Sequence, residues 1–206
     1  MEKTNKEITI AVFASGNGSN AENIINFFNH PKQNAANATQ KEAEVGLVVC
    51  NRPDAFVVER ARALNVPVEI VTRQQLNDET YFLCLMDKYN IGFIALAGFL
   101  LMIPSFLISR YQGRIVNIHP SLLPKYGGKG MYGRHIHEAV VAAGEKETGI
   151  TIHHVSDRCD EGAVIFQTSV AVESDDTPAT VEKKIHALER KHYPAVIAEI
   201  INPGQS

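Results

Sequence analysis

Two residues able to bind or protonate a reacting group, Asn117 and His119, end a short run of β-branched residues. Pro120 follows, and proline lacks a backbone donor and disfavours helix at the residue before it, so the run predicts a strand that ends at His119. Residues two apart on a strand point to the same side, which would place an amide and an imidazole in one pocket. An isolated pair of this kind is more typical of a structural histidine, so partners elsewhere must decide.

A glycine turn near the amino end predicts an anion site. The sequence SGNGSN at residues 15–20 separates a buried strand at 8–14 from a segment with apolar residues at helical spacing. Glycines let a backbone approach a ligand closely, and the amides of Gly18, Ser19 and Asn20 would face an anion at the positive end of a helix. A phosphate group fits this arrangement best.

Two alternatives exist for this turn. With Ala21 its glycines match the loose dinucleotide fingerprint, but the second strand ends at Asn51 without the acidic residue that would hold a ribose. Ser19 could instead cap the helix, with Glu22 as its capping-box partner. We rank phosphate binding above both.

An acidic turn, HHVSDRCDEG at residues 153–162, connects two strand-like runs. A carboxylate from this turn could reach the imidazole of His119, hold it protonated or relay a proton through water. From the residues alone, Asp157 and Asp160 are both candidates. A metal site is not expected, because neither the HxH at 135–137 on a helix nor the HH at 153–154 on a strand puts both rings on one face.

Composition limits the class of protein. The chain has 206 residues, 45% hydrophobic and 21% charged, with a formal net charge of −3. These values are typical of a globular domain that buries a full core. We expect no nucleic-acid partner, because no basic run occurs, and no membrane segment or signal sequence. We therefore expect a cytoplasmic protein. Three cysteines without CxxC spacing predict free thiols.

The remaining chain alternates strands and helices. Expected strands cover residues 8–14, 45–50, 67–71, 91–97, 115–118, 149–155 and 163–172. Expected helices include residues 21–28, 54–64, 77–89, 104–111 and 134–143, with a polar loop at 31–44 and a last helix from Pro178. Asn77 or Asp78 would cap the third helix and Thr177 the last one. The alternation predicts a mostly parallel sheet covered on both faces, with antiparallel pairing in the last two strands.

These stretches together resemble the folate-dependent formyltransferase family, most closely its phosphoribosylglycinamide formyltransferases. The matching motifs are SGNGSN at 15–20, AGF at 97–99, NIHPSLLPKY at 117–126 and DxxDxG at 157–162. HPSLLP is shared by the wider family and indicates formyl transfer; SGNGSN and the short length indicate glycinamide ribonucleotide as acceptor. The resemblance covers nearly the whole chain. It implies a Rossmann-like fold in a single domain, 1–206, whose amino-terminal half binds the nucleotide phosphate and whose carboxy-terminal half holds the catalytic loop and folate site.

The resemblance also implies roles for particular residues. The catalytic residues would be Asn117, His119 and Asp160. The residues that bind the phosphoribosyl group of the acceptor would be Gly18, Ser19, Asn20 and Glu189. The residues that bind 10-formyltetrahydrofolate, the co-substrate, would be Leu100, Leu101, Met102, Ile103 and Asn117. From the residues alone, the run 100–103 could equally be core and Glu189 an exposed helix position.

Three departures from the family pattern affect the folate side. Leu101 stands where relatives often carry an arginine, and an arginine that helps bind folate ahead of the 77–89 helix has no clear counterpart. The segment 126–133, YGGKGMYG, is longer than the usual continuation and would close over the site differently.

The implied reaction moves a formyl group to an amine through an oxyanion held by Asn117 and protonated His119, while Asp160 favours the imidazolium and helps move a proton. Small molecules are the expected partners, and a homodimer is compatible with the sequence. The alternatives are formyltetrahydrofolate hydrolase, methionyl-tRNA formyltransferase and a non-catalytic nucleotide-binding module. We expect the first to carry an extra amino-terminal domain and the second a basic carboxy-terminal domain, whereas the third would not bring the catalytic three together.

Overall fold

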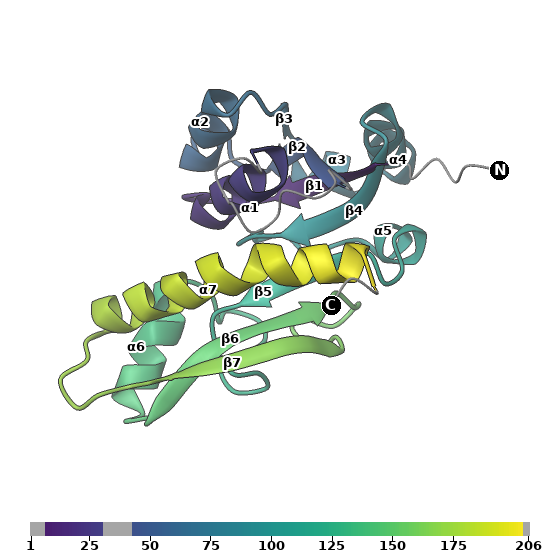
Figure 1. Cartoon of the computed structure of the whole chain (residues 1–206). Coiled ribbons are helices and arrows are strands. Elements are labelled where there is room, and N and C mark those ends of the chain that lie inside the picture. Colours follow the sequence, from purple (N-terminus) through teal and green to yellow (C-terminus); the bar gives the residue numbers. More distant parts are fainter. Residues whose placement is uncertain (1–6, 31–42, 204–206) are drawn as a thin grey trace.

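The computed structural model describes residues 7–30 and 43–203. Strands in this part of the chain are β1 (Ile8–Phe13), β2 (Ala43–Cys50), β3 (Val68–Ile70), β4 (Ile91–Leu96), β5 (Ile115–His119), β6 (Glu147–His154) and β7 (Val164–Ala171). Helices are α1 (Ser19–Asn29), α2 (Phe56–Ala63), α3 (Arg73–Asn77), α4 (Glu79–Lys88), α5 (Ser105–Arg110), α6 (Arg134–Ala142) and α7 (Pro178–Ile201). Figure 1 shows α7 crossing in front of the strands.

The strands form one seven-stranded sheet in the order β3-β2-β1-β4-β5-β6-β7. β1 to β5 are parallel, whereas β6 is antiparallel to both β5 and β7. The predicted α/β fold, with antiparallel pairing near the carboxy-terminal end, is therefore confirmed. The order reverses between β1 and β4, and open α/β sheets bind ligands outside the carboxyl ends of strands at such a point.

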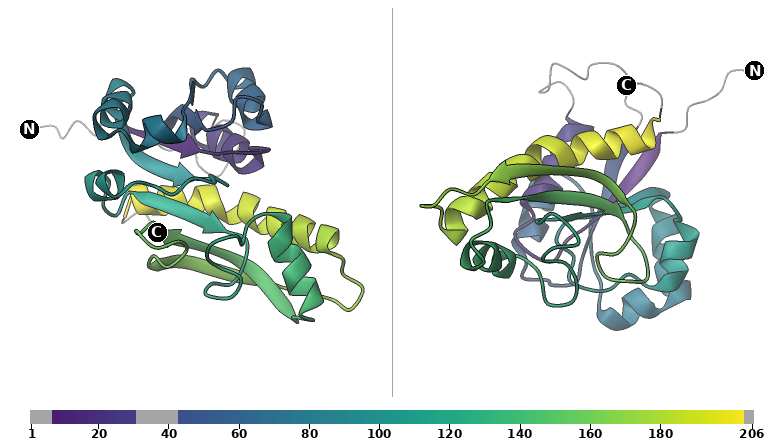
Figure 2. Two further views of the ribbon diagram at one scale, coloured as in Figure 1. Left: turned by 180° about the vertical axis from the view of Figure 1, so that it is seen from behind. Right: turned by 90° about the horizontal axis from the view of Figure 1, so that it is seen from below.

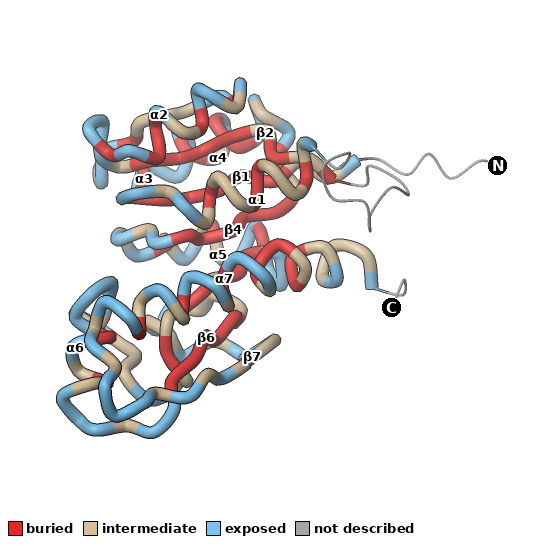
Figure 3. The backbone as a smooth tube through the Cα atoms, turned by 60° about the vertical axis from the view of Figure 1, so that its left-hand side comes forward, coloured by how far each residue is buried: buried red, intermediate tan, exposed pale blue. Residues whose placement is uncertain are grey.

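The core lies on both faces of the sheet because alternate residues of each parallel strand point to opposite sides. In β1, Ile10 and Val12 pack with α1, α2 and α7, whereas Ala11 and Phe13 pack with α3, α4 and α5. Figure 3 shows most of β1, β2 and β4 in red, the colour of buried residues. Seen from behind, in the left panel of Figure 2, the segment after β5 and helix α6 lie in front of the sheet, and α7 passes behind it.

Local signals placed several element ends correctly. Thr177 caps α7 with Pro178 in its first turn, and the side chain of Asp78 accepts the backbone N–H of Tyr81 at the start of α4. Helix α3 is not among the expected helices; Thr72 caps its start through a capping box with Gln75. Thr-x-x-Gln is a recognisable start signal, so this helix could have been found.

Two strands begin earlier than predicted. β2 starts at Ala43 and β6 at Glu147, each two residues before the expected start. The expected polar loop at 31–44 is therefore wrong at its last two residues, and its residues 31–42 lie outside the described part. Ala43 and Glu44 pair with Ile8 and Thr9 of β1, so long-range pairing extended the strand beyond its β-branched run.

Candidate functional site

A cavity of about 1110 Å³ lies at the carboxyl ends of β1, β4 and β5. Its wall consists of the turns after β1, β4 and β6, the end of β5, the loop 128–133 and residues from α3, α6 and α7. All residues predicted to form the site line this cavity except Ile103. The strand end at His119 therefore shares one chamber with the glycine turn and the acidic turn, as the hypothesis requires.

The start of α1 presents backbone amides to the cavity. Gly18 is the N-cap, with a φ of 80°, and no side chain makes a capping hydrogen bond there. A Cβ at this position would lie 2.5 Å from the side chain of Val57, so glycine is needed for conformation and for space. The alternative in which Ser19 caps the helix is wrong, because Ser19 is already helical and Glu22 pairs with Arg60. The amides at this helix start remain available for an anion.

Arg60 and Ser15 hold the turns around the cavity, and neither is among the residues predicted to form the site. Arg60 of α2 donates to the carbonyl oxygen of Asn17 at 3.0 Å and to its Oδ1 at 3.2 Å. Ser15 is fully buried; its Oγ donates to Oδ1 of Asn51 at 2.5 Å and accepts from the backbone N–H of Leu100 at 2.9 Å. Ser15 thus connects the ends of β1, β2 and β4, and this explains a polar residue at the end of β2.

Antiparallel pairing of β5 with β6 assembles the reactive centre. The register places Asn117 opposite His153, and the turn after β6 returns Asp160 to the end of β5. Nδ1 of His119 lies 3.6 Å from Oδ2 of Asp160, and both side chains are about nine-tenths buried, with exposures of 6% and 11%. The carboxylate and the imidazole face each other where little water can screen them.

The tautomer of His119 follows from its second contact. Its Nε2 lies 2.7 Å from the carbonyl oxygen of Tyr126, which can only accept, so Nε2 carries a hydrogen. The nitrogen that gains or loses a proton is therefore Nδ1, the one that faces Asp160. A protonated His119 can donate through Nδ1 toward a reacting oxygen or the carboxylate.

His153 orients the amide of Asn117. Nδ1 of His153 donates to the carbonyl oxygen of His154 at 2.9 Å, so the neutral ring accepts through Nε2 from Nδ2 of Asn117 at 3.2 Å. Burial lowers the pKa of His153, which favours this neutral form. The second N–H of the amide then stays free to donate to a ligand. The sequence alone predicts no role for His153, although a histidine inside the expected strand at 149–155 is a usable signal.

The acidic turn presents Asp160, not Asp157. Asp160 has a φ of 57°, a left-handed conformation that aspartate tolerates better than most residues, and its Oδ2 accepts the backbone N–H of Gly128 at 2.9 Å. A Cβ at Gly162 would lie 1.6 Å from the carbonyl oxygen of His154, so the glycine of the motif lets the turn close against β6. Asp157 is exposed and does not line the cavity, which settles the choice that the residues alone left open.

Cys159 contacts the same carboxylate. Its thiol donates to Oδ2 of Asp160 at 3.6 Å, and burial, followed by the charge of Asp160, raises the pKa of the thiol. The group is therefore a protonated thiol at neutral pH and a poor nucleophile.

Only part of the segment after β4, residues 100–103, lines the cavity as predicted for folate binding. Leu100 and Met102 are 50% and 55% exposed and line the cavity with Leu101, so the reading of the whole run as core is wrong. Ile103 is 6% exposed and packs in the core beside α5, because the segment turns inward there. Arg73 of α3 also lines the cavity and adds a positively charged side chain to its wall.

The cavity also reaches the interface of α1, α6 and α7. Nδ2 of Asn20 donates to Oε2 of Glu189 at 3.0 Å, and Glu189 is 7% exposed, so it is not a solvated helix position. Burial raises the pKa of Glu189, against the opposing effect of the Asn20 hydrogen bond. His137 of α6 is 3% exposed, and within the described part of the chain its Nδ1 has no hydrogen-bond partner. These groups suit a ligand that carries hydroxyl groups.

The sequence matches the model of the formyl transferase family over residues 8–197. The chain belongs to the formyltransferase family. It is 36% identical over 195 residues to phosphoribosylglycinamide formyltransferase of Bacillus subtilis (strain 168), covering 93% of each chain. The crystal structure of phosphoribosylglycinamide formyltransferase from Bacillus halodurans superposes on this formyltransferase with a TM-score of 0.80 at 36% identity, covering 94% of this chain and 95% of that one. Glycinamide ribonucleotide transformylase 1 from Geobacillus kaustophilus gives a TM-score of 0.81 at 35% identity, covering 96% and 100%.

The resemblance inferred from the motifs is thus confirmed. No helix in the described residues is long and apolar enough to cross a membrane. In the same ranges, no group of three or more His, Cys, Asp or Glu side chains is placed to hold a metal ion.

Proposed function

We propose that the protein transfers a formyl group from 10-formyltetrahydrofolate to the amine of glycinamide ribonucleotide, a step of purine biosynthesis. The observation that carries this proposal is the convergence of Asn117, His119 and Asp160 in the cavity that also holds the uncapped start of α1. The close relatives named phosphoribosylglycinamide formyltransferase support the choice of acceptor. A non-catalytic nucleotide-binding module would not need the reactive centre.

The residues have separable tasks in this reaction. Attack of the amine nitrogen on the formyl carbon turns the carbonyl oxygen into an oxyanion, which preorganised donors stabilise. The free N–H of Asn117 and the Nδ1–H of protonated His119 are those donors. The attacking amine loses a proton and the departing folate nitrogen gains one, and Asp160 passes that proton through water. No covalent intermediate with the protein is formed.

Different elements of the single domain bind the two substrates. The amides of Gly18, Ser19 and Asn20 bind the phosphate, and Glu189 binds the ribose hydroxyls. Leu100, Leu101 and Met102 hold the pterin of the folate largely through main-chain groups, and Asn117 reaches the formyl group. Ile103 supports that segment from the core. The guanidinium of Arg73 supplies a positive charge for a carboxylate of the folate. This charge takes the place of the arginine that Leu101 replaces.

A direct assay tests the proposal. Protein, 10-formyltetrahydrofolate and glycinamide ribonucleotide are mixed, and the absorbance change on deformylation is followed. We expect folate consumption that depends on the nucleotide. Consumption without the nucleotide would support formyltetrahydrofolate hydrolase instead, and no consumption by a folded sample would refute formyl transfer. The homodimer and the cytoplasmic location stay predictions.

A further inference from the structure

The carbonyl oxygen that fixes the tautomer of His119 belongs to a residue in an unfavourable backbone conformation. Tyr126 has a φ of 55°, in the left-handed region that a bulky residue without glycine's freedom adopts only when its surroundings hold it there. If that hold were lost, the residue would relax toward negative φ and its carbonyl would turn away from Nε2 of His119. The contacts that hold Tyr126 therefore affect the position of the His119 hydrogen, and through it catalysis.

Two groups hold Tyr126 from outside the cavity. The Oγ of Ser121, which is fully buried, donates to the carbonyl oxygen of Lys125 at 2.6 Å and fixes the preceding peptide. The phenolic Oη of Tyr126 donates to Oε1 of Glu145 at 3.0 Å. Glu145 lies in the turn between α6 and β6, so this bond fastens the loop after β5 to a separate element.

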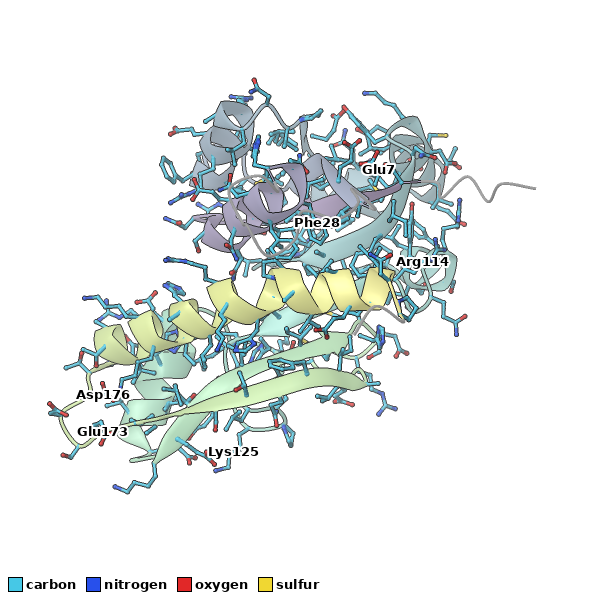
Figure 4. All side chains as sticks on the ribbon, viewed as in Figure 1. Glu7, Phe28, Arg114, Lys125, Glu173 and Asp176 are labelled. Atoms are coloured by element: carbon cyan, nitrogen blue, oxygen red, sulfur yellow. The ribbon has the colours of Figure 1, made fainter. Side chains whose placement is uncertain are left out.

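Glu145 also receives Lys125, whose Nζ lies 3.0 Å from both carboxylate oxygens. The hydrogen bonds from Lys125 and then Tyr126 lower the pKa of Glu145, so it is ionised at neutral pH. The Lys125 side chain is 65% exposed, against 24% for Glu145, and Figure 4 shows Lys125 at the outer edge of the molecule below β6 and β7. Because exposed ion pairs contribute little to stability, we expect the hydrogen bond between Glu145 and Tyr126, and not the ion pair with Lys125, to hold the loop after β5.

We propose that Glu145 is a positioning residue for His119, acting through the phenol of Tyr126 and its backbone carbonyl. The inference rests on the proposed formyl transfer for its catalytic meaning. Glu145 lies outside the cavity and touches no reacting atom. It holds Tyr126 in the left-handed conformation, the Tyr126 carbonyl keeps the hydrogen on Nε2, and Nδ1 is thereby kept as the nitrogen that faces Asp160 and the reacting oxygen.

The chain offers a graded set of variants. Tyr126→Phe removes the phenolic donor, Glu145→Ala removes its acceptor, and Glu145→Gln keeps an acceptor oxygen. Lys125→Met removes only the exposed ion pair. Glu138→Ala is the matched control, since Glu138 is a surface carboxylate of α6 whose ion pairs are with Arg134 and His135 of the same helix.

We expect Tyr126→Phe and Glu145→Ala each to lower kcat about tenfold, equivalent to about 1.4 kcal/mol, with both KM values within about twofold. Glu145→Gln should recover most of the loss, and Lys125→Met and the Glu138 control should stay near wild type. The double variant Tyr126→Phe/Glu145→Ala should be no slower than either single variant, because both remove one shared bond. Additive losses would overturn the proposal.

The nitrogen chemical shifts of the His119 ring give a readout that needs no substrate. Wild type should show hydrogen on Nε2, and Glu145→Ala a mixture of tautomers. A folded Glu145→Ala variant with an unchanged His119 ring would refute the positioning role, even if activity fell. Failure of the proposed function would give a different result, because the wild-type protein would then transfer no formyl group. The nitrogen spectra of His119 would still show whether Glu145 positions its ring.

Discussion

Replacing Asp160 with asparagine tests the reactive centre most directly. The change keeps the shape of the side chain and leaves an oxygen that can accept the N–H of Gly128, now 2.9 Å from Oδ2. It removes the negative charge 3.6 Å from Nδ1 of His119. The structural cost should be small and the electrostatic cost large.

The magnitude follows from that distance and from burial. Two unit charges at this separation attract by about 4.6 kcal/mol at an effective dielectric constant of ~20, which suits groups with side-chain exposures of 6% and 11%. If the imidazolium form of His119 loses that stabilisation in the transition state, kcat falls by about 10³-fold. Partial compensation by water would reduce the loss to ~10²-fold, the lower range for a positioned acid or base.

Stopped-flow absorbance of folate deformylation measures the rate, and calorimetric titration with glycinamide ribonucleotide measures binding. We expect kcat of Asp160→Asn to fall by ~10²–10³ while the Kd of the nucleotide changes less than about threefold. The reasoning is refuted if binding disappears while turnover per bound substrate is unchanged, because Asp160 would then position a ligand or stabilise the fold. A loss in kcat below about tenfold would also refute it, since that is under the range for an acid or base.

Three further perturbations follow from the site. Burial raises the pKa of Glu189 from 4.5, so the folded state holds a proton that the unfolded state releases, and stability falls as pH rises from 4.5 through the raised pKa. Glu189→Gln should abolish this fall in stability, which amounts to about 1.4 kcal/mol per unit of pKa shift. In thermal denaturation, the melting temperature of the variant relative to wild type should therefore be higher at pH ~8 than at pH ~4. An equal difference in melting temperature at both pH values would contradict this prediction. Gly18→Ala, with its Cβ 2.5 Å from Val57, should cost roughly 1–3 kcal/mol in urea denaturation and weaken phosphate binding at least tenfold, whereas an unchanged midpoint would show that the turn adapts. Arg73→Ala should raise KM for 10-formyltetrahydrofolate by about threefold to fivefold without changing kcat, because an exposed charge pair contributes up to about 1 kcal/mol. A changed KM for the nucleotide instead would place Arg73 on the other substrate.

Much of the fold could be predicted because its signals are local. Apolar runs gave the parallel strands, and the Thr177-Pro178 and Asp78 caps gave helix starts that the structure shares. The errors fall where pairing partners lie far away in sequence, as at Ala43, which β1 draws into the sheet. Ile103 was misplaced for a related reason, since a pattern of four apolar residues does not state which of them faces a cavity.

By itself, the sequence determined which groups were available and which local geometry each would take. The period of a strand puts Asn117 and His119 on one side, and the need for positive φ puts glycine at position 18. Only the tertiary structure decided that Asp160 meets His119, and that His153 and the Tyr126 carbonyl set the hydrogen positions of the amide and the imidazole. These contacts depend on the register of β5 against β6 and on the path of a loop, and both are fixed by packing between residues distant in the chain.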